Sequence, residues 1–201
     1  MKTAVFDIDG VLADYEGQLV KELYRRFGSV GLRNRDKYSL EDRFVDHPEI
    51  LECAQMLTED PNFYYGLPED VAAIRFVEDL LDDGFLAVYL TSRPSTARGF
   101  TRRWLIRKLT DTNPLVFCGA SDKVGWLESV YGNMDFVVED NPEQIEKIRK
   151  AGLTVLCWSQ PWNEGIFPRL YVRSTDQELM LWASEDTEAE PFFTMETGEK
   201  S

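Results

Sequence analysis

An α/β fold with a parallel, Rossmann-like sheet and helices on both of its faces is predicted by the sequence. Continuous apolar runs, among them Phe85 to Leu90, have the composition of strands that are buried on both faces. From there to Trp158, strand and helix patterns alternate regularly, which is typical of a parallel sheet. The 201 residues, 43% of them hydrophobic, are enough for one domain, or for one domain with a subdomain, around a real core.

The first predicted strand covers Thr3 to Asp7, and its apolar run is followed by Asp7 and Asp9. In open α/β sheets ligands bind at the carboxyl ends of the strands, so this strand carries two carboxylates to a candidate binding edge. Carboxylates this close repel each other unless a cation or a shared proton holds them, which indicates metal-assisted chemistry. Two plainer interpretations stay open: Asp9-Gly10 as a hairpin turn, and, less favoured, a calcium loop, whose twelfth position is here Gln18 instead of glutamate.

Helical patterns follow the first strand. An amphipathic helix is predicted over Glu16 to Phe27, and a second over Asp70 to Asp82, because apolar residues recur on one face of each. The stretch between them, Gly28 to Pro68, is polar, aromatic-rich and weakly periodic. We expect short helices in it, around Leu40–Phe44 and Ile50–Leu57.

The remaining elements alternate along the chain. Strands are predicted at Phe85–Leu90, Pro114–Cys118, Phe136–Val138 and Leu153–Trp158, and helices at Thr96–Leu109, Asp122–Val130 and Pro142–Ala151. We therefore expect a core domain from residues 1–11 and 66–183, with a small helical cap subdomain, residues 12–65, inserted after the first strand. Residues 184–201 are rich in acids and are predicted to form a solvated tail.

Composition narrows the possible partners. Asp and Glu outnumber Lys and Arg by 36 to 22, and the net charge of -14 repels nucleic-acid backbone unless the basic residues gather on one face. The cysteines, Cys53, Cys118 and Cys157, have no CxxC spacing, and with the lone His47 they support neither a disulfide framework nor a zinc site. Without a signal-peptide core or a membrane-spanning apolar stretch, the sequence predicts a cytoplasmic protein and no membrane partner.

The polar residues that end the apolar runs fall at points that a parallel sheet brings to one edge. Carboxylates, hydroxyls and a lysine in one crevice are too costly to arise by chance packing, so the sequence predicts a shared site. Its members are Asp7 and Asp9, Thr91-Ser92-Arg93, Ser121-Asp122-Lys123, and Glu139-Asp140-Asn141.

This ordered set resembles the haloacid dehalogenase-like (HAD) phosphohydrolases over roughly residues 1–160. Their four motifs are an aspartate pair, a hydroxyl residue, a lysine and an acidic pair, matched here by Asp7 with Asp9, by Thr91, by Lys123 and by Glu139 with Asp140. The resemblance implies a HAD-like fold and a phosphomonoesterase. The sequence also allows a nucleotide-binding module without turnover, although competent residues fill every motif position.

The resemblance assigns a role to each residue. Asp7 is the expected nucleophile, which forms an aspartyl-phosphate, and Asp9 the general acid and then the base. Mg²⁺ is the expected cofactor, held by Asp7, the Asp9 carbonyl and Asp140, with Glu139 assisting. The phosphoryl oxygens are expected to contact Thr91, the Ser92 backbone N–H and Lys123. The charges of the four acids and Lys123 sum to -3, and one Mg²⁺ brings the sum to -1. This remaining negative charge disfavours a phosphate dianion, so backbone N–H groups and Arg93 must offset it.

A narrower resemblance concerns the predicted cap. The opening from Asp7 to Gly17 and the segment Asn62-Phe63-Tyr64-Tyr65 are similar to the 5'(3')-deoxyribonucleotidases, in which aromatics at the positions of Tyr15 and Tyr64 clasp the nucleobase. Stacking of a base on an aromatic ring contributes about 1–3 kcal/mol. The resemblance thus implies a nucleoside monophosphate as the small-molecule substrate. The chain departs from that family at Thr91-Ser92-Arg93, where TSP is usual, and at Glu139, where aspartate is usual.

Those departures suggest an alternative substrate. Thr91-Ser92-Arg93 with Thr101-Arg102-Arg103-Trp104 is similar to the phosphatase domain of polynucleotide kinase–phosphatases, which removes 3'-phosphates from nucleic-acid ends. A basic run from Arg93 to Lys108 could contact a backbone. The net charge and the long predicted cap favour a mononucleotide instead. The sequence indicates no oligomeric state. It predicts neither a preferred base or sugar nor whether the phosphate is at the 5' or the 3' position.

Overall fold

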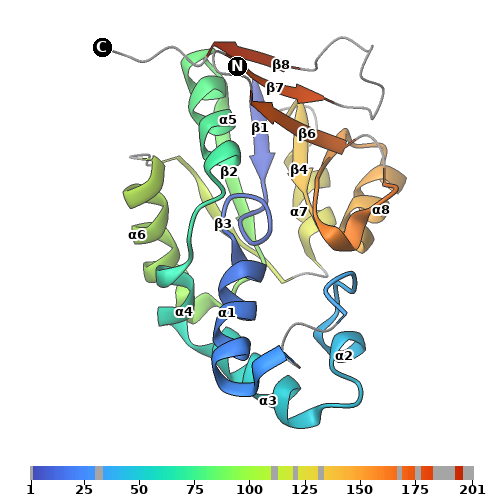
Figure 1. Cartoon of the computed structure of the whole chain (residues 1–201). Coiled ribbons are helices and arrows are strands. Elements are labelled where there is room, and N and C mark those ends of the chain that lie inside the picture. Colours follow the sequence, from blue (N-terminus) through green and yellow to red (C-terminus); the bar gives the residue numbers. More distant parts are fainter. Residues whose placement is uncertain are drawn as a thin grey trace.

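The computed structural model describes residues 2–29, 34–109, 113–119, 122–130, 134–166, 169–174, 178–182 and 193–196. Their sheet has eight strands in the order β3-β2-β1-β4-β5-β6-β7-β8 (Figure 1). The strands that run parallel are β1 (Thr3–Phe6), β2 (Leu86–Thr91), β3 (Leu115–Phe117), β4 (Phe136–Glu139), β5 (Val155–Trp158) and β6 (Arg169–Ser174). Two antiparallel strands, β7 (Glu178–Trp182) and β8 (Phe193–Glu196), extend the sheet beyond β6. The predicted α/β fold is confirmed.

Eight α-helices lie in the described part of the chain. They are α1 (Tyr15–Phe27), α2 (Leu40–Arg43), α3 (Pro48–Glu59), α4 (Pro61–Gly66), α5 (Val71–Asp82), α6 (Arg98–Leu109), α7 (Lys123–Val130) and α8 (Pro142–Lys150). Two short 3-10 turns, η2 (Ser95–Ala97) and η4 (Pro161–Asn163), follow β2 and β5. None of these helices is both long and apolar enough to cross a membrane.

Both faces of the parallel sheet are covered, as its continuous apolar strands require. Phe6 of β1 packs against Phe76 of α5, in the same cluster as α6. Its neighbour Val5 points to the opposite face, where it shares a cluster with Leu127 of α7 and Ile148 of α8. Successive strand residues thus enter two different cores, which explains why the strands lack an apolar–polar alternation.

The helices α1 to α4 lie beyond the carboxyl ends of the strands (Figure 1). Their buried residues, such as Leu23, Ile50 and Phe63, belong to the same cluster as the α5 and α6 face of the sheet. This packing places a second layer of side chains opposite the strand ends. The division into a cap, a core and a tail stays a prediction.

Several elements were not foreseen. The helix α4 has two local signals, Asp60, whose side chain accepts from the Asn62 N–H, and Pro61 at its first position, but its six residues are too few for a periodic pattern. The strands β6 and β7 follow the last strand that the sequence predicts. Within the predicted tail, residues 193–196 form β8, which pairs with β7; the rest of that tail lies outside the described residues, as does Ser121.

A buried ion pair joins α1 to α2. Both terminal nitrogens of Arg43 donate to the Glu16 carboxylate, at 2.7 and 2.6 Å, and Arg35 adds a contact at 3.1 Å. The Arg43 and Glu16 side chains are only 2% and 8% exposed. A charge this deeply buried depends on its partner, because water cannot replace it.

We expect Arg43→Met to lower the free energy of unfolding by about 3–5 kcal/mol, since it leaves Glu16 buried without its main partner while keeping most of the side-chain volume. Denaturant unfolding of the purified protein measures this. The matched control is Arg25→Met, because Arg25 pairs with Glu22 but is 71% exposed; its expected effect is about 0.5 kcal/mol or less. Equal effects of the two substitutions would contradict the structural role of the buried pair.

Candidate active site

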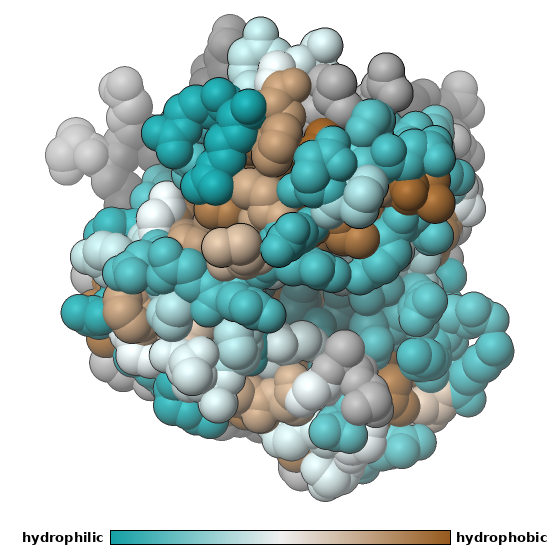
Figure 2. All heavy atoms as spheres, turned by 90° about the horizontal axis from the view of Figure 1, so that it is seen from below, coloured by the Kyte–Doolittle hydropathy of each residue, from teal (hydrophilic) through white to brown (hydrophobic). Residues whose placement is uncertain are grey.

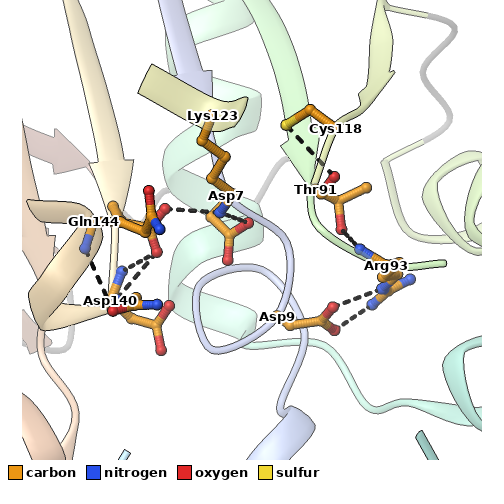
Figure 3. Close-up of polar contacts among 10 residues, drawn as sticks. Asp7, Asp9, Thr91, Arg93, Cys118, Lys123, Asp140 and Gln144 are labelled. Carbon is orange, nitrogen blue, oxygen red and sulfur yellow. Dashed lines mark hydrogen bonds and ion pairs between the residues drawn. The ribbon is translucent and has the colours of Figure 1, made fainter. Parts of the chain in front are cut away.

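The predicted site residues meet at the carboxyl edge of the sheet (Figure 3). Asp7 directly follows β1, Thr91 ends β2, Glu139 ends β4 with Asp140 next to it, and Lys123 begins α7. Asp7, Lys123 and Asp140 line a cavity of about 440 Å³, which residues of α1, α2 and α4 enclose from the other side. The face of the molecule seen from this end is mainly hydrophilic, with scattered apolar residues (Figure 2). Segments that are far apart in the sequence therefore share one polar cavity.

Lys123 holds two of the acids. Its Nζ lies 2.7 Å from Oδ1 of Asp7 and 2.8 Å from Oε2 of Glu139, and all three side chains are buried. Burial alone lowers the pKa of Lys123, but the carboxylates of Asp7 and Glu139 outweigh it and raise this pKa well above its usual value. The lysine is therefore charged at any physiological pH and remains a fixed cation in the site.

The remaining negative charge is not compensated within the described residues. Burial, together with the charges of Glu139 and Asp9, raises the pKa of Asp7 to about 7 despite the opposing effect of Lys123. Burial and the carboxylates of Glu139 and Asp7 raise the pKa of Asp140 well above its usual range. The Asp140 Oδ1 atom is buried, and no group in the described part of the chain donates a hydrogen bond to it. The carboxylate oxygens of Asp7, Glu139 and Asp140 lie within 4.8 Å of one another, a set of hard oxygen donors that fits a divalent cation such as Mg²⁺.

Gly10 allows the first loop to approach the acidic pair. It has a φ of +81°, and a Cβ there would lie 2.2 Å from Oδ2 of Asp140. The loop is closed by backbone N–H groups of Leu12 and Ala13, which both donate to the Ile8 carbonyl. Because β1 pairs in parallel with both of its neighbours, the hairpin interpretation of Asp9-Gly10 is wrong. The glycine instead makes room for a carboxylate from another strand.

Arg93 lines the cavity and contacts the second aspartate of the first motif. Its Nε and one terminal nitrogen lie 2.8 and 2.6 Å from the two Asp9 carboxylate oxygens. The other terminal nitrogen of Arg93 donates to the Thr101 hydroxyl. The guanidinium stacks 4.7 Å from the centre of the Tyr64 ring, and its side chain is fully buried. The Arg93 backbone N–H donates to Oγ1 of Thr91. Arg93 therefore pairs with the second aspartate, and direct substrate binding by Arg93 stays a prediction.

The predicted base-binding aromatics line the cavity but also pack against other side chains. Tyr15 meets Phe63 edge-on at 5.7 Å, and Phe63 meets Tyr64 in the same way. The Tyr64 hydroxyl donates to the Thr58 carbonyl at 2.6 Å. Ser92 also lines the cavity. The cavity is thus bordered by Tyr15, Tyr64 and Ser92, whereas their contact with a substrate stays a prediction.

Two aromatic residues of the site were missed. Trp162 in η4 and Tyr38 before α2 also line the cavity, with their rings 6.0 Å apart at 67°. Burial and the carboxylates of Asp140, Glu139 and Asp7 raise the pKa of Tyr38, although the residue is half exposed. A signal for Trp162 was available, because it follows the carboxyl end of β5 at the same sheet edge.

Comparison with known proteins agrees with this geometry. The sequence model of the family described as "5' nucleotidase, deoxy (Pyrimidine), cytosolic type C protein" matches residues 2–183. None of the curated proteins matches the chain. Among solved structures, a dehalogenase gives a TM-score of 0.54 at 15% identity, covering 83% of this chain and 87% of that one. A haloacid dehalogenase-like hydrolase from Streptococcus pneumoniae gives 0.51 at 13%, covering 78% and 84%.

A further similar structure belongs to the Pnkp1/Rnl/Hen1 RNA repair complex. Its TM-score is 0.49 at 15% identity, and the match covers 78% of this chain but only 42% of that one. The chain thus spans less than half the length of that protein. At such identities, the two structures with the higher TM-scores show only that the HAD-like fold is shared. The family follows instead from its sequence model, which matches residues 2–183.

We expect Asp140→Asn to stabilise the metal-free protein at pH 8 by about 1–3 kcal/mol. Because the pKa of Asp140 is higher in the folded than in the unfolded protein, its carboxyl favours folding at low pH, and this contribution is lost as the pH rises. The gain should therefore shrink toward pH 4. Denaturant unfolding in chelator at both pH values measures it, with exposed Asp83→Asn as the control. A less stable variant at pH 8 would contradict the uncompensated charge.

Proposed function

Because the chain belongs to the 5' nucleotidase, deoxy (pyrimidine), cytosolic type C family of HAD-like phosphatases, we propose that it is a Mg²⁺-dependent phosphomonoesterase that dephosphorylates nucleoside monophosphates through an aspartyl-phosphate. One observation supports this chemistry above the others. Asp7, the first side chain after β1, lies 2.7 Å from the buried Lys123 and beside Asp140. One buried carboxylate oxygen of Asp140 has no hydrogen-bond partner among the described residues.

Asp7 is the proposed nucleophile. A carboxylate oxygen of Asp7 attacks phosphorus, and the bond from phosphorus to the ester oxygen breaks as the new bond forms. The metal-free pKa of about 7 means that a proton competes for this carboxylate near neutral pH. The Lys123 contact at 2.7 Å favours the ionised form, which is the form that attacks. The leaving oxygen then needs a proton.

Asp9 is the proposed source of that proton. It protonates the leaving alcohol, and as a carboxylate it then takes a proton from the water that attacks the aspartyl-phosphate. This second step releases inorganic phosphate and restores the Asp7 carboxylate. The two hydrogen bonds from Arg93 orient the Asp9 carboxyl, whose side chain is still 22% exposed to the cavity. Arg93 therefore acts as a positioning residue for Asp9.

The phosphoryl oxygens would be held by Thr91, the backbone N–H of Ser92 and Lys123. Ser92 and Lys123 line the cavity, and Thr91 is the last residue of β2, next to Ser92. Mg²⁺ would be held by the Asp7 and Asp140 carboxylates and the Asp9 carbonyl, with Glu139 in support. When bound, this cation supplies positive charge between nucleophile and phosphoryl group. Glu139 already contacts Lys123, and this supports an indirect role for it.

The substrate would enter under the helices α1 to α4, which we propose to act as a cap formed by residues 12–65 on a core of residues 1–11 and 66–183. Tyr15 and Tyr64 line the cavity from this side, where a nucleobase could stack. The family description names a cytosolic type, and we extend the proposal to a cytoplasmic location.

The alternative, a 3'-phosphatase of nucleic-acid ends, needs free basic groups on α6. The described contacts of α6 are instead within the chain. Arg103 and Arg107 flank the Tyr65 ring at 5.5 and 4.6 Å, and Lys108 pairs with Glu69. Arg102 donates to the Asn113 carbonyl. These contacts favour a mononucleotide over a polynucleotide.

We expect Asp7→Asn to lower phosphate release from nucleoside monophosphates by at least about 10³-fold, because the amide cannot attack phosphorus. With ³²P-labelled substrate, acid-quenched wild-type protein should carry label that Asp7→Asn lacks. Asp83→Asn, with the same charge change at an exposed site, should behave as wild type. Binding of nucleotide without any release by the wild type would support the non-catalytic module instead.

We also expect 5'- or 3'-mononucleotides to be turned over with a kcat/KM at least about 10-fold above that of a 3'-phosphorylated oligonucleotide, since the α6 basic groups are engaged within the chain. A panel of both classes, assayed for phosphate release in Mg²⁺, measures this ratio. Turnover of the oligonucleotide alone would overturn the mononucleotide proposal and support the alternative.

A further inference from the structure

The turn after β5 holds the two loops that carry the proposed cation site. The Gln160 amide donates to the Gly10 carbonyl at 2.7 Å. The Asn163 amide donates to the carbonyls of Asp140, at 2.9 Å, and of Trp158, at 2.8 Å. Both loops are thereby tied by their backbones to one short turn. This turn lies outside the four motif segments that carry Asp7, Thr91, Lys123 and Asp140.

Trp162 in the same turn contacts the Asp140 side chain itself. Its indole N–H donates to Asp140 Oδ2 at 3.2 Å. That oxygen also packs against Gly10, where a Cβ would come within 2.2 Å of it. The other oxygen, Oδ1, is buried and accepts no hydrogen bond from any residue that the structure describes. The indole therefore helps to determine which carboxylate oxygen remains available for a cation.

An indole is suited to orienting the Asp140 carboxylate because it donates a hydrogen bond without carrying a charge. A lysine or arginine at the same place would neutralise Asp140 and repel a divalent cation. The neutral N–H fixes the orientation of the carboxylate and leaves its negative charge to the cation. Hydrogen-bond donors and acceptors behind metal ligands commonly affect metal affinity in this way.

The Trp162 ring is also in contact with Tyr38, at 6.0 Å between ring centres and 67° between planes. Tyr38 precedes Ser39, whose side chain caps α2 by accepting from the Asp42 N–H. The same helix ends at Arg43, which is paired with Glu16 of α1. Contacts thus run from the buried ion pair through α2 and Tyr38 to Trp162, and from there to Asp140.

We propose that Trp162 is a positioning residue for the cation ligand Asp140, and that Tyr38 supports Trp162 through their ring contact at the cavity wall. This deepens the proposed function and rests on its cation site. Cation affinity then depends on a residue that lies near α2, outside the metal ligands. Because such coupling is reciprocal, a substrate that favours the Tyr38–Trp162 contact also binds more tightly when the cation is present.

The test is a titration of the metal-free full chain with Mn²⁺, a cation that prefers similar oxygen ligands and whose free form is counted by electron paramagnetic resonance. We expect Trp162→Phe, which keeps an aromatic ring but loses the N–H, to weaken Mn²⁺ binding about 10-fold. Tyr38→Ala should weaken it roughly 3-fold, and Tyr38→Phe, which keeps the ring, should leave it unchanged. The combined Trp162→Phe and Tyr38→Ala variant should bind no more weakly than Trp162→Phe alone, because the two act through one contact.

Matched controls are available in the chain. Trp126→Phe makes the same change in α7, and Tyr24→Ala removes a tyrosine that is 54% exposed, against 50% for Tyr38. Neither should change Mn²⁺ affinity. Phosphate release by Trp162→Phe should recover when Mg²⁺ is raised about 10-fold, a rescue that a loss of folding would not permit, and circular dichroism checks the fold of each variant.

The outcomes separate this inference from the function on which it rests. Wild-type affinity in Trp162→Phe would overturn the positioning role while leaving the phosphatase proposal intact. Weakened binding in Trp162→Phe with an unchanged Tyr38→Ala would overturn the support by Tyr38. A wild-type protein that binds no Mn²⁺ would overturn the cation site itself, and with it both proposals.

Discussion

The buried contact between Lys123 and the two carboxylates of Asp7 and Glu139 is the interaction on which the rest of the site depends. It places one ammonium group in the wall of the cavity, where burial alone would lower its pKa and the two carboxylates raise it. It also leaves Asp140 with a buried oxygen that no described group binds. A third buried acid beside a lysine that is already paired with two acids destabilises the folded protein. Such arrangements of perturbed titratable groups are typical of functional sites.

This arrangement follows from the parallel sheet. Strands that run the same way end at the same edge, so residues next in sequence to β1, β2 and β4 become neighbours in space. Because α5 and α6 cover one face of the sheet and α7 and α8 cover the other, the open edge is the place where polar side chains can gather. Gly10 then lets the first loop come close enough for Asp140 to pack against its backbone.

The sequence predicted the parts of the molecule that depend on local pattern. Apolar runs and helical periodicity located the strands β1 to β5 and most helices within a few residues, because burial on both faces leaves a strong signal. The motif residues were predicted to converge, and they do. The helix α4 is too short for periodicity, and contacts between distant segments, such as Tyr38 with Trp162, leave no pattern within either segment. The pairing of Arg93 with Asp9 escaped for the same reason, since 84 residues separate the partners.

That pairing changes the charge balance of the site. Counting the four acids and Lys123 alone gives -3, but the buried Arg93 belongs to the same cavity and brings the sum to -2. One divalent cation then makes the site neutral, and a phosphate dianion no longer meets a net negative charge. Without the cation, protons take its place, as the raised pKa values of Asp7 and Asp140 indicate. Cation and proton thus compete for the same oxygens, and the nucleophile is ionised most readily when the cation has displaced the proton.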